Sequence, residues 1–313
     1  MKKVYNAVVG VSVNSEFELV VKDASGSKKE LDMSLCPCPS GSSGNTNGAI
    51  RRLGGNSHLV GLVEVNYDQE EETLESLLLK RVIKQGGVSF TPVPVLSKTN
   101  VAAIPIIKGI NGEVWGKKGK IIHSMVPSAL QILKGPSVRI GPNTFSVVTG
   151  LRKVELPFAK ALLDRTEAGF RVLNAKATLC AISREFKKIL KLVDLLVLNR
   201  REFEETGMEL SELYDCGPKL TIVTDDSDGG MFSFGRYEER LFKPVCFPGG
   251  KFETGAGDWF LGALISEFIR LKKSTKTIEL GEFENAINFA ARVAGKKITI
   301  PGGGNGPSRH QLR

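Results

Sequence analysis

Short apolar runs alternate along the chain with segments in which apolar residues recur at helical spacing. From about residue 127 this alternation becomes regular. It predicts helices over 127–134, 156–169, 180–191, 257–272 and 282–295, strands over 145–149, 171–174, 194–198 and 219–223, and a hairpin near 231–242. Upstream, the same pattern predicts strands over 4–13, 59–63 and 101–107, and helices over 44–53 and 70–85. Strands that alternate with helices indicate a mostly parallel sheet covered on both faces.

Two segments, 14–40 and 92–122, depart from this rhythm, because they carry short β signals separated by turn residues. A small β layer that projects from the main sheet would account for both. We find no internal repeat and no low-complexity linker, so we expect a single domain over 1–313. The glycine-rich segment 302–307 is expected to be flexible.

The composition is that of an ordinary globular protein, with 41% hydrophobic and 25% charged residues. No stretch reaches the roughly 18 apolar residues that would span a bilayer. The apolar run near the N-terminus contains Asn6 and Gly10 and lacks a cleavage site, so it predicts a first strand instead of a signal peptide. Five cysteines form no regular framework, which favours a reducing, cytoplasmic compartment. Three widely spaced histidines give no pattern of a metal cluster or a Ser-His-Asp triad.

The formal net charge of +9 favours anionic partners. Basic residues occur in short scattered runs, such as Lys117-Lys118 and 270–273, without interleaved aromatic residues. This distribution favours nucleotides or phosphorylated metabolites over nucleic acid.

The stretch 252–262 carries the most chemical information. Gly255, Ala256 and Gly257 directly precede Asp258, and an apolar helical pattern follows. Small residues let an anion approach backbone N–H groups closely, and a helix start adds unpaired N–H donors. A carboxylate in the same turn can accept a proton from an alcohol. The alternative interpretation is a glycine turn whose acid simply favours the N-terminus of a helix.

Four further patterns occur in a fixed order around this stretch. Asn199-Arg200-Arg201-Glu202 follows the strand Leu195–Leu198, and Ile222-Val223-Thr224 ends a strand ahead of Gly229-Gly230. Near the N-terminus lie the glycine loop Gly41-Ser42-Ser43-Gly44-Asn45 and, further on, Thr99-Asn100-Val101. Together with Thr254-Gly255-Ala256-Gly257-Asp258, this ordered set resembles the ribokinase-like (PfkB) carbohydrate kinase family over nearly the whole chain.

The resemblance implies an α/β fold: a ribokinase-like three-layer core with a mostly parallel central sheet and a small β lid formed by segments near 14–40 and 92–122. It implies transfer of the γ-phosphoryl group of ATP to a substrate hydroxyl. Asp258 would be the general base, and the amides of Gly255, Ala256 and Gly257 would form an anion hole. Glu202 would order Mg²⁺, through water. Without the resemblance, Glu202 would be interpreted as a solvated helix acid.

The resemblance also assigns binding residues. Those for nucleotide would be Asn199, Thr224, Gly229 and Asn288, although Asn199 could instead be a helix cap and Thr224 and Asn288 ordinary polar positions. Those for substrate would be Asn14, Glu18, Gly41 and Asn45. An alternative alignment selects Glu16 in place of Glu18.

Three positions depart from the family pattern. Phe252 stands where the family often has an acid, Asp225-Asp226 replace a usual glycine turn, and Ser42-Ser43 alter the substrate loop.

From the resemblance we expect an ATP-dependent kinase of a sugar, a sugar phosphate or a related polyol. We keep two alternatives: a nucleoside kinase of the same fold, and a non-catalytic binding or scaffold protein. Open lid edges could pair with another subunit to form a homodimer.

Overall fold

The computed structural model describes residues 6–11, 14–15, 20–21, 31–32, 39–66, 80–81, 83–84, 87–97, 107–108, 114–115, 123–125, 131–133, 135, 138, 140–151, 155–165, 169–181, 183–236, 238–250, 252–273, 277–300 and 303–312.

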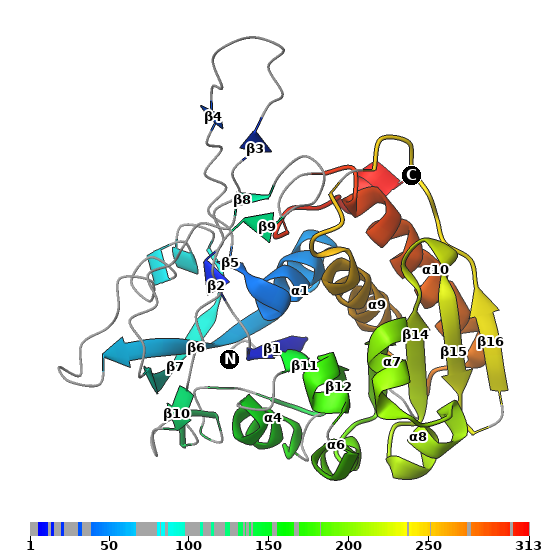
Figure 1. The fold of residues 1–313 in the computed structure, drawn as a ribbon, viewed down its shortest axis with the longest axis horizontal. Coiled ribbons are helices and arrows are strands. Elements are labelled where there is room, and N and C mark those ends of the chain that lie inside the picture. The colour runs from blue at the N-terminus through cyan, green and yellow to red at the C-terminus, as the bar shows by residue number, and fades with distance from the viewer. Residues whose placement is uncertain are drawn as a thin grey trace.

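A ten-stranded sheet runs through the molecule in the order β10-β7-β6-β1-β11-β12-β13-β14-β15-β16 (Figure 1). Its seven central strands, from β7 to β14, pair in parallel, and antiparallel strands flank them at both edges. The bounds are β10 His123–Met125, β7 Phe90–Ser97, β6 Ser57–Asn66, β1 Ala7–Val11, β11 Phe145–Leu151, β12 Phe170–Ala175, β13 Leu195–Asn199, β14 Leu220–Thr224, β15 Gly230–Phe234 and β16 Glu238–Phe242.

Helices cover both faces of this sheet, giving three layers (Figure 1). One face packs against α1 (Gly41–Arg52), α9 (Ala256–Leu271) and α10 (Leu280–Lys297). The other packs against α4 (Leu156–Leu163), α5 (Ala177–Cys180), α6 (Ser183–Leu190) and α8 (Leu210–Cys216), while α7 (Arg200–Thr206) follows β13. Short 3₁₀ turns lie at η2 (Asp226–Asp228) and η3 (Arg309–Leu312).

Continuous apolar runs form the central strands because both faces are buried. In β13, Leu195 and Val197 contribute to the core under α9 and α10, whereas Leu196 and Leu198 contribute to the core under the opposite helices. All four are at most 3% exposed. This double burial distinguishes the strand from a half-exposed one with alternating polarity.

Most of the predicted strands and helices are confirmed, with three differences. Segment 156–169 is helical only to Leu163, segment 180–191 contains the end of α5 and then α6, and α7 and α8 were not predicted. The prediction that segment 302–307 is flexible was wrong for 303–307, because Gly303, Gly306 and Pro307 are buried. The predicted elements at 70–85, 101–107 and 127–134 fall mostly outside the described residues.

The two segments expected to form a lid contain short antiparallel ladders. β2 (Asn14–Ser15) pairs with β5 (Pro39–Ser40), β3 (Val20–Val21) with β4 (Leu31–Asp32), and β8 (Ile107–Lys108) with β9 (Val114–Trp115). None of the described helices is long and apolar enough to cross a membrane.

Candidate active site

The carboxyl ends of the parallel strands meet at one edge of the sheet, where ligands bind in open α/β folds. β13 ends there at Asn199 and β14 at Thr224, in register with each other. The N-terminal turns of α1 and α9 come together, because the side chain of Asn45 on α1 contacts Asp258 on α9. Four of the residues singled out in the sequence therefore lie in two contacting pairs, Asn45 with Asp258 and Asn199 with Thr224.

Asp258 is the third residue of α9, and its carboxylate has a fixed partner on another helix. The Asn45 side-chain amide donates a hydrogen bond of 2.9 Å to Oδ2 of Asp258. Asn45 is 3% exposed, so its amide is held by the surrounding packing. The Thr46 hydroxyl also donates to the backbone carbonyl of Asp258 at 3.3 Å. Two successive residues of α1 thus set the position of Asp258.

Gly255 precedes α9 in the left-handed region, with φ +83°. A Cβ atom there would lie 2.7 Å from the Gly303 carbonyl oxygen, so both the backbone angle and the space require glycine. Ala256 donates its N–H to the Glu253 carbonyl at 3.0 Å. Within the described part of the chain, the N–H groups of Gly255 and Gly257 have no acceptor. These two amides are available for an anion at the positive end of the helix.

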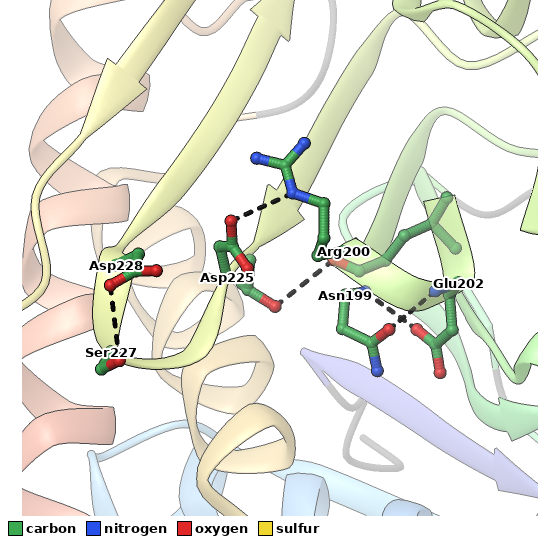
Figure 2. A network of polar contacts seen from close by, with 8 residues as sticks. Asn199, Arg200, Glu202, Asp225, Ser227 and Asp228 are labelled. Carbon is green, nitrogen blue, oxygen red and sulfur yellow. Dashed lines mark hydrogen bonds and ion pairs between the residues drawn. The ribbon is translucent and has the colours of Figure 1, made fainter. Parts of the chain in front are cut away.

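Asn199 and Glu202 form a capping box at the start of α7 (Figure 2). Asn199 Oδ1 accepts from the Glu202 N–H at 2.8 Å, and Glu202 Oε2 accepts from the Asn199 N–H at 2.9 Å. Asn199 is therefore a helix cap, which was the alternative to nucleotide binding considered from the sequence. Glu202 is only 5% exposed, so it is not a solvated helix acid.

The pKa of Glu202 is raised, mainly because burial disfavours the charged carboxylate. The hydrogen bond from Asn199 and the charge of Lys176 oppose this shift, while the charge of Asp258 adds to it. Glu202 and Asp258 thus interact electrostatically across the strand ends. Among the described residues, no three His, Cys, Asp or Glu side chains gather into a metal cluster.

An ion pair joins the ends of β13 and β14. Arg200 Nε lies 3.0 Å from Oδ2 of Asp225 (Figure 2). The turn that follows is closed by a 2.8 Å hydrogen bond from the Asp225 N–H to the Gly229 carbonyl, and Asp226 has a positive φ of 40°. The acid that replaces the usual glycine turn is thereby paired with a cation, which reduces its repulsion of an incoming anion.

The other predicted residues occupy different surroundings. Thr224 ends β14, with its hydroxyl 3.4 Å from the Leu198 carbonyl, and Gly229 has a φ of +90° where a side chain would collide with the Phe242 carbonyl. Gly41 begins α1, Asn288 is exposed on α10, and the backbone of Asn14 pairs with Ser40. Glu18 and the alternative Glu16 lie outside the described residues.

Sequence reasoning missed three contributors to this site. Arg200 was part of a quoted motif, but its partner Asp225 lies on a neighbouring strand end. Thr46 adjoins Asn45, so helical spacing could have included it. Gly303 was assigned to a flexible tail, although its carbonyl contacts the N-terminus of α9.

Comparison with protein-family models matches residues 138–310 to the pfkB family carbohydrate kinases. The match covers more than half of the 313 residues. The chain belongs to the pfkB family. A search of the curated proteins found no match.

Solved structures agree with this pfkB fold. A mutant of phosphofructokinase-2 from Escherichia coli matches with a TM-score of 0.68 and 14% identity, over 95% of this chain and 94% of that one. Ribokinase from Giardia lamblia matches with a TM-score of 0.65 and 17% identity, over 99% and 98%. A nucleoside kinase from Methanocaldococcus jannaschii matches with a TM-score of 0.59 and 15% identity, over 99% and 97%. The pfkB chain is therefore a kinase-type phosphotransferase with a ribokinase-like α/β fold.

Proposed function

We propose that this pfkB kinase transfers the γ-phosphoryl group of ATP to a hydroxyl of a sugar, a sugar phosphate or a related polyol, with Asp258 as the general base. One observation carries the proposal. The Asp258 carboxylate is held by Asn45 in the first turn of a helix whose Gly255 and Gly257 amides have no acceptor among the described residues. A proton acceptor and an anion site therefore adjoin.

Asp258 accepts the proton of the substrate hydroxyl as that oxygen forms its bond to phosphorus and the bond to the ADP oxygen breaks. The hydrogen bond from Asn45 fixes the orientation of Oδ2, and the ionised carboxylate is the form that can accept the proton. The amides of Gly255 and Gly257 stabilise the negative charge of the phosphoryl group in transfer. The Ala256 N–H is already bonded to the Glu253 carbonyl, so this residue helps to shape the turn and does not offer its own amide to the anion.

Mg²⁺ fits the chemistry of Glu202. This carboxylate is buried and has a raised pKa, so a nearby cation would stabilise its ionised form. Only one of its oxygens is engaged in the capping box. Mg²⁺ is usually held by few carboxylates together with water and substrate phosphates, so the lack of a dense acid cluster among the described residues agrees with this assignment. When bound, the ion would neutralise negative charge on the phosphates.

Nucleotide binding is assigned to Asn199, Thr224, Gly229 and Asn288, and acceptor binding to Asn14, Glu18, Gly41 and Asn45. Three of the nucleotide residues lie at the ends of β13 and β14 or in the turn that follows. Segments 14–40 and 92–122 would close over the acceptor and exclude water. Their strand edges could also form a homodimer. The cysteine content favours the cytoplasm.

A nucleoside acceptor is the second candidate. It is favoured by the similarity to the nucleoside kinase from Methanocaldococcus jannaschii and to aminoimidazole riboside kinase from Salmonella enterica. Both candidates share the donor site and the base, so they differ only in the acceptor. A panel of acceptors separates them.

The test is a coupled ADP-release assay with Mg²⁺ and ATP over a panel of sugars, sugar phosphates, polyols and nucleosides. We expect turnover with a sugar-type acceptor and a loss of about 10²–10⁴ in kcat for Asp258→Asn. Turnover with nucleosides alone would select the second candidate. Unchanged activity of Asp258→Asn would refute the base. Calorimetric titration without binding of Mg²⁺–ATP, together with no turnover, would leave a non-catalytic binding protein.

A further inference from the structure

Lys297, near the carboxyl end of α10, is fully buried, with 0% of its surface exposed. Its Nζ donates a hydrogen bond of 2.9 Å to the Ile300 carbonyl, and its own carbonyl accepts from the Ile300 N–H at 2.9 Å. Burying an amino group costs free energy unless the group forms hydrogen bonds. Its burial here indicates that the fold needs the amino group at this position. Cationic side chains are favourable near the carboxyl end of a helix, where the backbone carries partial negative charge.

The turn that Lys297 closes continues into a segment that contacts α9. We call residues 298–300 and 303–306 the C-terminal strap. Before α9, the Phe252 N–H donates to the Ile298 carbonyl of the strap at 2.9 Å. Within the first turn of α9, the Trp259 indole N–H donates to the Gly303 carbonyl at 3.1 Å.

Two close backbone approaches complete this contact. The same Gly303 carbonyl would lie 2.7 Å from a Cβ atom on Gly255, and Gly306 lies against the face of the Trp259 ring. The strap is thus attached before, at and after the glycine turn that begins α9. In Figure 1 the strap, coloured red, passes close to the ends of α1 and α9.

We propose that Lys297 is a positioning residue for phosphoryl transfer: its buried amino group fixes the C-terminal strap, and the strap fixes the N-terminus of α9. This inference rests on the proposed function for its kinetic consequence. Gly255 adopts a left-handed φ. Because glycine has no Cβ atom, its own backbone torsion angles are only weakly restricted. The Gly303 carbonyl and the Trp259 indole supply that restriction from outside. Displacement of a reacting group by about 1 Å can cost about 10²-fold in rate.

The experiment removes the amino group and then returns it in solution. Lys297→Ala leaves a cavity, whereas Lys297→Met keeps most of the side-chain volume without the charge. Lys296→Ala is the matched control, because its Nζ lies over the Phe247 ring at 5.2 Å and not on the strap. Each protein is assayed for kcat and for KM of the acceptor, with and without methylammonium. Hydrogen exchange over 252–260 is measured on the same samples.

For Lys297→Ala we expect kcat to fall by about 10- to 100-fold with little change in KM, and hydrogen exchange over 252–260 to increase. Methylammonium should restore both kcat and hydrogen exchange in Lys297→Ala but not in Lys297→Met. The control Lys296→Ala should behave like the wild type with or without methylammonium. If Lys297→Ala does not fold, Lys297→Met must show the same fall in kcat and the same increase in exchange.

Two results would overturn the inference: a folded Lys297 variant with wild-type kcat, or a lower kcat with wild-type exchange over 252–260. Failure of the proposed function has a different signature. The wild type would then show no turnover, while hydrogen exchange in Lys297→Ala would still increase and would still be restored by methylammonium.

Discussion

Asn45 and Asp258 lie 213 positions apart in the sequence, and their side chains are joined by a 2.9 Å hydrogen bond. The donor is the side-chain amide of Asn45, and the acceptor is Oδ2 of the Asp258 carboxyl group. The bond therefore holds in place the oxygen that a general base at this position would use. It also couples the orientation of that carboxylate to the packing of α1 on α9.

Replacing Asn45 by aspartate should raise the pH at which the kinase becomes active. Two carboxylates at this distance cannot both ionise freely, so the pair holds a proton to higher pH. The acidic limb of the pH–kcat profile should move upward, whereas Asn45→Ala should lower kcat by about 10- to 100-fold through lost orientation. Asn285→Asp, at an exposed position on α10, is the control. An unshifted profile for Asn45→Asp would contradict the coupling.

Glu202→Gln should separate the structural role of this residue from its electrostatic role. Glutamine can still accept the Asn199 N–H, so the capping box and the melting temperature should be retained. Loss of the charge should lower kcat and raise the Mg²⁺ concentration needed for half-maximal activity. Glu212→Gln makes the same replacement in the capping box of α8 and should change neither kinetic quantity. Equal kinetics for the two variants would remove Glu202 from metal binding.

Arg200→Met should weaken ATP binding because it leaves the Asp225 carboxylate unpaired near the proposed phosphate site. Both side chains are partly exposed, so the expected effect is a two- to fivefold increase in KM for ATP, about 1 kcal/mol or less. The double variant Arg200→Met/Asp225→Asn should recover the wild-type KM, since it removes the uncompensated charge as well.

The control for this pair is Arg236→Met, which breaks an exposed ion pair with Asp215 at 2.8 Å. It should leave KM for ATP unchanged. Were the double variant no better than Arg200→Met, the effect of Arg200 would not be charge compensation of Asp225.

His58 should make the folded state sensitive to mild acid. It is buried on β6, its two ring nitrogens bond the hydroxyls of Ser89 and Thr91 at 2.8 Å, and burial lowers its pKa from 6.5 to about 4. The unfolded chain therefore takes up a proton below pH 6.5, whereas the folded protein does so only near pH 4. Stability from this group is complete above pH 6.5 and is lost as the pH falls towards 4, by roughly 3 kcal/mol in all.

Urea unfolding at pH 7, 5.5 and 4.5 measures this loss. His58→Gln keeps hydrogen-bonding groups without titrating in this range, so its midpoint should vary less with pH than that of the wild type. His310→Gln, at an exposed position on η3, should follow the wild type. Parallel curves for all three proteins would exclude His58 as the origin of the pH dependence.

The strands could be predicted because a strand that is buried on both faces is a continuous run of apolar residues. Leu195 to Leu198 form an uninterrupted apolar run, and each residue enters one of the two cores. The sequence did not predict α7, whose segment Arg200–Thr206 is mostly polar and is stabilised at its start by the Asn199–Glu202 capping box instead of an apolar stripe. The glycines at 303–306 suggested flexibility, but Gly306 is needed because the Trp259 ring leaves no room for a Cβ atom.

The site was predictable where its chemistry is local. Gly255 to Asp258 lie in one turn, so their spacing alone placed the glycines beside the acid. The bond between Asn45 and Asp258 and the pair between Arg200 and Asp225 depend on how separate elements pack, which no local pattern encodes. Their partners become identifiable only once the strand order is known.

The attachment of α9 to both α1 and the C-terminal strap has a consequence for biosynthesis. A nascent chain that has reached only β13 contains β1 and α1, but neither α9, which carries the proposed base, nor the strap has been translated. An incomplete nascent chain therefore lacks Asp258 and could not carry out the proposed phosphoryl transfer. Contacts between residues this far apart in the sequence also slow folding.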